Sequence, residues 1–163
     1  MCLLWLSALS REVFALQEQT FATGDVFFSC LQRDGLGELL IQNKLGDKDA
    51  VAVLTLPDTT MLFSVYIRKG EDYQLQGIPN GAYLLWFATG RQWDPENFRF
   101  QADGSYERFE KVLQFTTKET KNEILYSSLI VTLYPVVHGN APTKHVAKER
   151  FPRPKSVSNE NQP

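Results

Sequence analysis

The sequence predicts an all-β fold, an antiparallel β-sandwich of the immunoglobulin or transthyretin-like kind. Apolar and polar residues alternate through most of the stretch from 36 to 135, and groups of turn-forming residues separate these alternating runs. No segment carries an apolar stripe at helical spacing for more than about two turns. Strands without a layer of helices must pack sheet on sheet or close as a barrel, and short strands favour the sandwich.

Length, composition and charge limit the classes of protein that fit. A chain of 163 residues suffices for one domain with a sizeable core, and 43% hydrophobic with 22% charged residues is typical of a globular protein. The formal net charge of −2 provides no basic surface for nucleic acid, so we expect no nucleic-acid partner. No apolar run approaches the roughly 18 residues that a membrane-spanning helix needs. We therefore expect no transmembrane span.

Alternation predicts the first strands directly. It is cleanest in the third of them, where Phe63, Val65 and Ile67 should share one face while Tyr66 lies on the other. These first three predicted strands cover residues 38–43, 50–56 and 61–68.

Two turns are predicted after these strands. Residues 69–72 contain Gly70 and are predicted as a hairpin turn, because glycine adopts a positive φ without steric cost. The Pro-Asn-Gly sequence at 79–81 is the strongest turn signal of the chain. Since the chain must reverse there, the strand at 82–88 should pair antiparallel with a short strand at 73–77.

The strand at 82–88 is apolar on both faces, whereas a strand with one solvated face would alternate with polar residues. Its second face, which carries Trp86, must therefore be covered by a loop, the N-terminal segment, another protomer or a ligand. One interpretation is a long loop over residues 90–108 that folds back and covers this face with Trp93 and Phe98, positioned by a turn at Asp94.

The other interpretation is an exposed aromatic patch used for binding. Trp86 is its leading candidate, because an indole prefers a site that is partly apolar and partly wet. The candidate binding residues are Trp86, Trp93, Tyr66, Asp94 and Phe98.

Later strands are predicted at 112–117 and 124–136, and residues 105–111 are predicted as a loop leading into the first of these. In the last strand, Leu125, Leu129 and Val131 should share one face.

The two ends of the chain differ from the middle. Residues 1–15 are predicted as a possible signal peptide cleaved after Ala15, or else as a short amphipathic N-terminal helix. The sandwich domain should cover 20–138, and the polar segment 139–163 should form an extended or disordered tail. Cys30 is predicted to be a buried, unreactive thiol.

Residues suited to catalysis are scarce. His138 and His145 are the two histidines, and no cysteine or carboxylate cluster accompanies them, so we expect no metal site and no cofactor. Asp94 and Glu96 could form a carboxylate pair of the kind that glycosidases use, but acidic residues of a loop are usually just solvated. Arg108 is predicted, with Arg68, Lys69 and Arg91, as a surface charge and not as part of an anion site.

Several motifs together resemble an uncharacterised family of bacterial exported β-sandwich domains. They are SVYIR at 64–68, GIPNGAY at 77–83, TGRQWD at 89–94 and PVVHGNA at 135–141. The resemblance implies a sandwich in an exported or surface-anchored protein, and no assigned activity. The GIPNGAY element is also similar to the hairpin of transthyretin-like and carboxypeptidase-regulatory domains.

These observations lead to the expectation of a non-catalytic exported sandwich module for protein binding or assembly. It would act in the periplasm, at the cell surface or outside the cell. One alternative is a domain that binds or acts on glycans, with Trp86 and Trp93 stacking on sugars. Another is a structural subunit of a larger envelope assembly.

Overall fold

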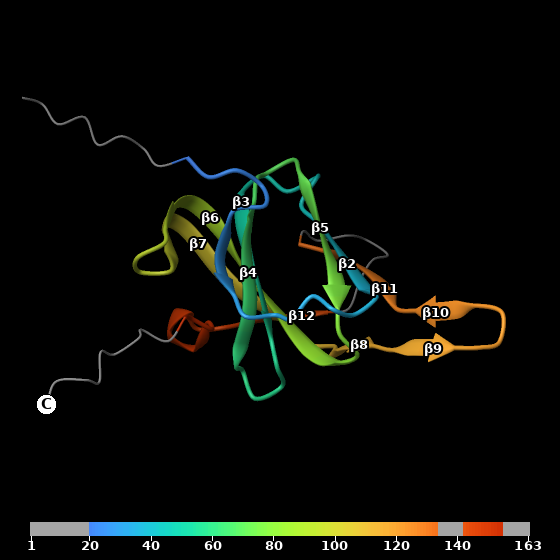
Figure 1. Cartoon of the computed structure of the whole chain (residues 1–163). Coiled ribbons are helices and arrows are strands. Elements are labelled where there is room, and N and C mark those ends of the chain that lie inside the picture. Colours follow the sequence, from blue (N-terminus) through green and yellow to red (C-terminus); the bar gives the residue numbers. More distant parts are fainter. Residues whose placement is uncertain (1–19, 134–141, 155–163) are drawn as a thin grey trace, which may run out of the picture.

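The computed structural model describes residues 20–133 and 142–154, and within them the chain is all-β (Figure 1). Two sheets face each other, and nearly all neighbouring strands are antiparallel, so the predicted antiparallel β-sandwich is confirmed. The larger sheet has the order β1 (Val26–Ser29), β4 (Met61–Ile67), β3 (Asp49–Thr55), β6 (Gly81–Asp94), β7 (Arg99–Phe109) and β12 (Thr143–His145), and β8 (Leu113–Phe115) also pairs with β6.

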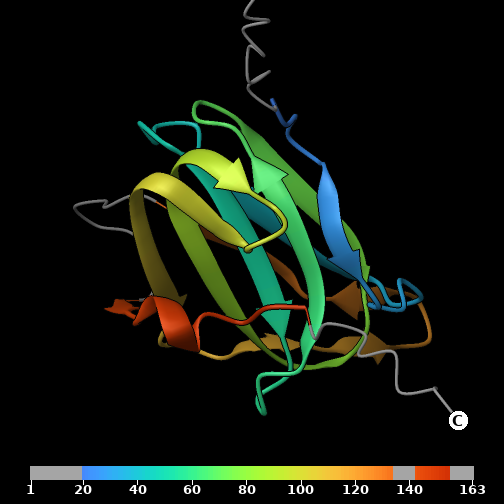
Figure 2. The same ribbon diagram turned by 90° about the vertical axis from the view of Figure 1, so that its left-hand side faces the viewer.

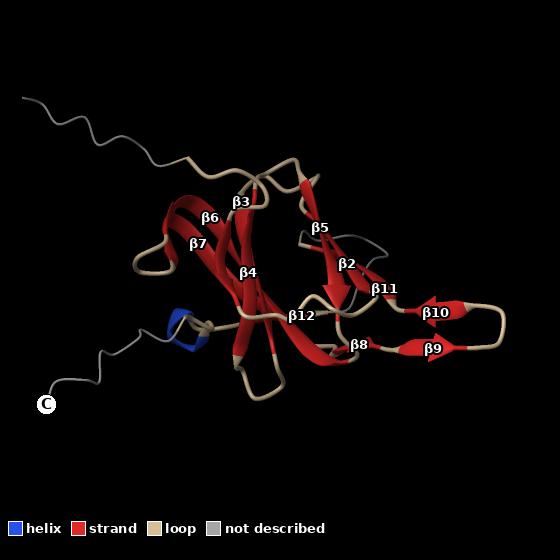
Figure 3. Cartoon of the chain, in the orientation of Figure 1, coloured by secondary structure: helices blue, strands red, loops and turns tan. Residues whose placement is uncertain are grey.

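The smaller sheet faces one side of the larger one. It has the order β11 (Ser128–Thr132), β2 (Gly37–Gln42) and β5 (Asp72–Ile78). A separate two-stranded sheet, β9 (Thr117–Glu119) with β10 (Ile124–Tyr126), extends away from both layers, and the only helical element described is a single 3-10 turn, η1 (Lys148–Arg150) (Figure 3).

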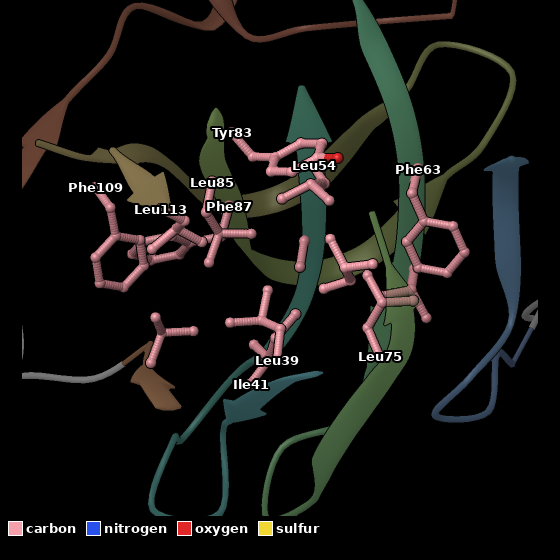
Figure 4. Close-up of a cluster of buried hydrophobic side chains, with 14 of the residues drawn as sticks. Leu39, Ile41, Leu54, Phe63, Leu75, Tyr83, Leu85, Phe87, Phe109 and Leu113 are labelled. Atoms are coloured by element: carbon pink, nitrogen blue, oxygen red, sulfur yellow. The ribbon is translucent and has the colours of Figure 1, made fainter. Parts of the chain in front are cut away.

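The main hydrophobic core fills the space between the two sheets (Figure 4). Period-2 alternation places its side chains, because every second residue of each strand points inward. Phe63, Val65 and Ile67 of β4 belong to this core, as predicted, and Leu39 and Ile41 of β2 meet them from the other layer.

The predicted pairing of 73–77 with 82–88 is wrong. The turn at 79–81 exists, but it carries the chain from the smaller sheet to the larger one: β5 pairs with β2, while β6 pairs with β3, β7 and β8. The hairpin predicted at 69–72 is wrong for the same reason, since β4 and β5 lie in different sheets. Each turn reverses the chain as expected. β5 cannot pair with β6, however, because β6 pairs with β3 along one edge and with β7 and β8 along the other.

The predicted loop at 90–108 is instead a long two-stranded ribbon formed by β6 and β7. Residues 105–109, also predicted as loop, lie within β7. The ribbon bends where its register shifts between Thr89 and Arg91, at Gly90. Such bulges bend a strand and increase its twist. The ribbon can therefore remain hydrogen-bonded while its far end curls over the outer face of the larger sheet (Figure 2).

The predicted strand at 124–136 breaks at Ser127. β10 pairs with β9, whereas β11 turns into the smaller sheet and pairs with β2 in parallel, the one parallel pair among the described strands. The Ser127 Oγ donates a hydrogen bond to the Thr116 carbonyl oxygen at 3.3 Å, which joins the two chain segments where β9 and β10 leave the sandwich.

The expectations for the chain ends fall partly outside the described residues. Residues 1–15 and His138 lie outside them. Part of the predicted tail is described: residues 142–154 form β12 and η1, and Phe151 is buried against the larger sheet. The prediction of a buried Cys30 is wrong; it is exposed just beyond the end of β1, where the next residue, Leu31, turns into the core instead. Within the described part of the chain, no helix is long and apolar enough to cross a membrane.

Candidate functional site

Four of the five predicted binding residues are buried in a second cluster on the outer face of the larger sheet. Trp86, Trp93, Tyr66 and Phe98 are 7%, 4%, 4% and 3% exposed. Asp94 is only partly buried, and its carboxylate lies at the end of the ribbon. The expectation that the second face of β6 is covered is therefore met, and these aromatic side chains form no exposed patch.

Three segments together provide the cover (Figure 2). The curled end of the β6–β7 ribbon brings Trp93 against Phe98 and Phe100, with ring centroids 5.0 and 4.9 Å apart. From the N-terminal side, Phe27 packs 5.6 Å from Trp93, and from the C-terminal side Phe151 packs 5.2 Å from Tyr106. Aromatic pairs at such distances add stabilisation beyond the area that they bury.

Trp86 lies in the same cluster but in different surroundings. Its indole Nε1 donates a hydrogen bond to Thr55 Oγ1 at 3.0 Å, so its polar atom is satisfied within the sheet. The Arg108 guanidinium lies over the indole ring, 5.4 Å from its centre. Arg108 is half-buried and packs over an aromatic ring. The prediction that it is a solvated surface charge is therefore wrong.

Tyr66 borders a small polar recess at the other end of the cluster. Its hydroxyl donates a hydrogen bond to Asp49 Oδ2 at 2.7 Å. Burial, followed by this bond and the charge of Asp49, raises the pKa of Tyr66 far above its usual value. The recess measures about 100 Å³ and is also lined by Arg68 and Trp93, whose Nε1 has no hydrogen-bond partner among the described residues.

Asp94 organises the turn between β6 and β7. Its carboxylate accepts hydrogen bonds from the Asn97 backbone N–H at 3.0 Å and from Asn97 Nδ2 at 2.8 Å, and Arg99 Nε lies 3.8 Å away. These interactions, led by the Asn97 backbone N–H, lower the pKa of Asp94. The carboxylate therefore acts as a turn-forming group, and its hydrogen-bond and ion-pair partners among the described residues include no carboxylate of Glu96 or of another acidic residue.

Apolar side chains are exposed instead in the first part of the segment 124–136, which was predicted as a single strand. We call residues 117–126, which form the β9–β10 hairpin, the arm. Ile124, Leu125 and Tyr126 are 53%, 50% and 47% exposed, and the arm projects away from the sandwich (Figure 1). Alternation predicted that Leu125 and Val131 share one face, but Val131 lies in the core while Leu125 is exposed, because the chain leaves the sandwich before Ser127.

An apolar groove of about 430 Å³ adjoins the base of the arm. Its walls come from the chain segments that enter and leave the arm, Lys111–Gln114 on one side and Leu129–Val131 on the other. Val112 and Ile130 in these walls are 38% and 58% exposed. Arm and groove together carry five exposed apolar side chains.

Groups that could hold a metal ion are absent from the described residues: nowhere in 20–133 and 142–154 do three His, Cys, Asp or Glu side chains gather. His145 lies on β12 and is exposed.

The outer aromatic cluster is part of the fold of the β-sandwich, and the arm with its groove carries five of the exposed large apolar side chains of the described residues. Comparisons with protein-family models, with curated proteins and with solved structures find no match for this chain.

Proposed function

We propose that this chain is a non-catalytic binding module that docks onto another protein through the arm and the apolar groove beside it. The observation that carries the proposal is the half-exposure of Ile124, Leu125 and Tyr126 on a hairpin that packs on neither sheet. A two-stranded hairpin is only marginally stable by itself in water, and contiguous exposed apolar surface is typical of interaction sites. A partner that covered these side chains would stabilise both the arm and the complex.

The charges of the arm favour an apolar contact. Lys118 and Lys121 are balanced by Glu119 and Glu123, so the arm presents no net charge to steer a strongly acidic or basic partner. The strand register places Ile124 opposite Glu119 and Tyr126 opposite Thr117, which puts both large side chains on one face of the hairpin. We infer that this face is the centre of the contact.

The arm also offers backbone hydrogen bonds. Among the described strands, β9 and β10 pair only with each other, and β11 lies at the edge of the smaller sheet. Open strand edges can accept a strand from another chain, with side-chain pockets adding specificity. The apolar groove between β8 and β11 would then receive side chains from the partner.

The test is capture of a partner from the envelope fraction of the native host. The arm variant Ile124→Ser/Tyr126→Ser should lose the partner that the unchanged chain captures, while its melting temperature changes little. Leu45→Ser is the matched control, because Leu45 is an apolar side chain 75% exposed and remote from the arm in sequence. Retention of the same partner by the arm variant, or its loss from the Leu45→Ser variant, would contradict the proposal.

Export remains part of the proposal, on the basis of the apolar start of the chain and the small residues before the expected cleavage point after Ala15. N-terminal sequencing of protein recovered from the native host tests it. An intact Met1 would count against cleavage.

The structure offers no observation that favours the glycan alternative. Trp86 and Trp93 are 7% and 4% exposed, and Arg108 lies over the indole of Trp86, so neither tryptophan offers an open ring face on which a sugar could stack. The alternative of a structural envelope subunit differs from the proposed module only in the permanence of the contact, and it would use the same arm.

A further inference from the structure

A third pocket, which shares no residue with the arm, its groove or the recess beside Tyr66, lies on the outer face of the larger sheet. It has a volume of about 330 Å³ and is lined by side chains from β6, β7, β12 and η1. Its apolar wall is formed by Trp86, Val146 and Ala147. Its cations are Arg108, Lys144 and Arg150, and we call it the basic pocket.

The three cations come from three different elements, and no carboxylate of the described residues forms an ion pair with them. None of the three forms an ion pair with any described residue, and the lining contains no Asp or Glu. The nearby Glu107 accepts a hydrogen bond from Thr143 Oγ1 at 2.6 Å and does not line the pocket. A concave site with one sign of charge concentrates ions of the other sign.

Strand pairing places two of these cations directly opposite each other. Lys144 of β12 is the register partner of Arg108 of β7, and Arg108 is in turn the partner of Trp86 of β6. Opposed residues have Cβ atoms about 5 Å apart, and like charges in this arrangement destabilise a sheet. An anion held between Arg108 and Lys144 would remove this repulsion, so anion binding at this pocket should be favourable.

The pocket is also held in place before any ligand binds. The guanidinium of Arg108 lies over Trp86, whose indole is itself fixed by Thr55. The Val146 backbone N–H donates to the Tyr106 carbonyl oxygen at 2.9 Å, which anchors the chain after β12. Groups that are already ordered lose less entropy when they bind a ligand.

We propose that the basic pocket binds a small organic molecule that carries a phosphate or carboxylate group. Arg108, Lys144 and Arg150 bind the oxyanion, since guanidinium groups match the geometry of phosphate and carboxylate oxygens. Val146 and Ala147, together with the small part of Trp86 that remains exposed, contact the apolar part of the ligand. The volume lies at the low end of the range for small-molecule sites, which favours a ligand of about 10 to 15 non-hydrogen atoms.

The experiment is an NMR titration of the full chain at constant ionic strength with four probes: phenyl phosphate, benzoate, inorganic phosphate and phenol. We expect saturable shifts of the Trp86 indole N–H and of the 144–147 amides with phenyl phosphate or benzoate, and weaker binding of inorganic phosphate and of phenol. The preference between the first two probes identifies the anionic group.

Variants assign the response to the pocket. Lys144→Ser/Arg150→Ser should weaken binding of the better probe at least tenfold, and both side chains are exposed, so the fold should persist. Lys118→Ser/Lys121→Ser on the arm removes the same charge elsewhere and should leave binding unchanged. In the absence of an anion, Lys144→Ser alone should raise the melting temperature at low salt relative to Lys121→Ser, because it removes the opposed pair.

Three outcomes would overturn the proposal: no saturable response to either organic anion, equal binding of phenol, or unchanged binding by the Lys144→Ser/Arg150→Ser variant. Tighter binding of inorganic phosphate than of phenyl phosphate would refute the inference that the ligand has an apolar organic part. None of these results bears on the arm, so the proposed docking function is tested separately.

Discussion

The indole Nε1 of Trp86 donates a hydrogen bond to Thr55 Oγ1 at 3.0 Å, and both residues are buried on the outer face of the larger sheet. Thr55 Oγ1 in turn donates to the Leu56 carbonyl oxygen at 2.9 Å. The polar atoms of Trp86 and Thr55 are thus satisfied by the strands themselves. This relationship makes Trp86 a part of the core.

Replacing Trp86 should therefore cost folding stability. We expect Trp86→Ala to lower the free energy of unfolding by about 3–5 kcal/mol, the usual cost of truncating a buried aromatic side chain. Trp93→Ala should behave alike, since Trp93 is 4% exposed. Chemical denaturation measures both, with Leu45→Ala as the exposed control. A loss below about 1 kcal/mol would show that the outer aromatic cluster does not stabilise the fold.

The hydrogen bond itself is tested by Thr55→Val. The substitution preserves shape but leaves the indole N–H of Trp86 buried without its acceptor, which costs roughly 1–3 kcal/mol. Thr55→Ser retains the hydroxyl and should lose less stability than Thr55→Val. If the two variants are equally stable, the bond contributes nothing measurable.

Asn43 joins the two sheets and should be sensitive to substitution. It follows β2 of the smaller sheet, is 1% exposed, and its Nδ2 donates to the carbonyl oxygens of Lys48 at 3.0 Å and of Arg68, just beyond β4, at 3.2 Å. Asn43→Ala leaves both carbonyls without this donor, so we expect a loss of roughly 1–3 kcal/mol in unfolding free energy.

The matched control is Asn122→Ala in the exposed turn of the arm, which should stay within about 0.5 kcal/mol of the unchanged chain. Asn43→Asp sharpens the test, because a carboxylate would place oxygen against the same carbonyl oxygens. It should be less stable than the chain with Asn43, and equal stability would show that the donor is not needed.

Asp94 should make the ribbon turn sensitive to acid. The hydrogen bonds from Asn97 hold the pKa of Asp94 below its usual range in the folded protein. A depressed folded-state pKa gives stabilisation that is present above the unfolded-state pKa of about 4 and is lost as the pH falls through the folded-state value. We expect the amide signals of Asn97 to change in that acidic window.

NMR titration of the side-chain carboxyl of Asp94 measures the pKa directly. Asn97→Ala removes the side-chain donor and should raise the pKa of Asp94, whereas Arg91→Ala, at an exposed residue that pairs with Asp103, should not. A pKa of Asp94 at or above the usual Asp value would contradict this account of the turn.

Local patterns predicted the faces of the strands well and their partners poorly. Alternation correctly placed Val65 and Tyr66 on opposite faces of their strand, because the pleat of a strand is a local property. The turn at 79–81 was also predicted, but no local signal distinguishes a hairpin from a connection between sheets. The register of β6 depends on β3 and β7, which are distant along the chain.

The exposed surfaces were harder to predict for a similar reason. Leu125 and Leu129 share one alternating pattern, yet the first is half-exposed on the arm and the second packs against the core. Arg108 joins Lys144 in one pocket only because β12 returns to the edge of β7 after a gap of more than 30 residues. Contacts between such distant segments depend on the topology of the sheets, which cannot be predicted from the residue pattern of either segment alone.

Gly90 is the position where the bend of the ribbon depends on a missing side chain. A Cβ at this residue would lie 2.5 Å from Phe100 Cβ and 3.0 Å from the Ala102 carbonyl oxygen. Gly90→Ala should therefore push the two strands apart and destabilise the fold by roughly 1–3 kcal/mol, a typical cost of overpacking. Gly104→Ala is the control in the facing strand, because a Cβ there meets nothing closer than 3.5 Å. Denaturation of both variants should show a loss for Gly90→Ala only; an equal loss would mean that backbone freedom, and not the close approach of Phe100, explains the glycine.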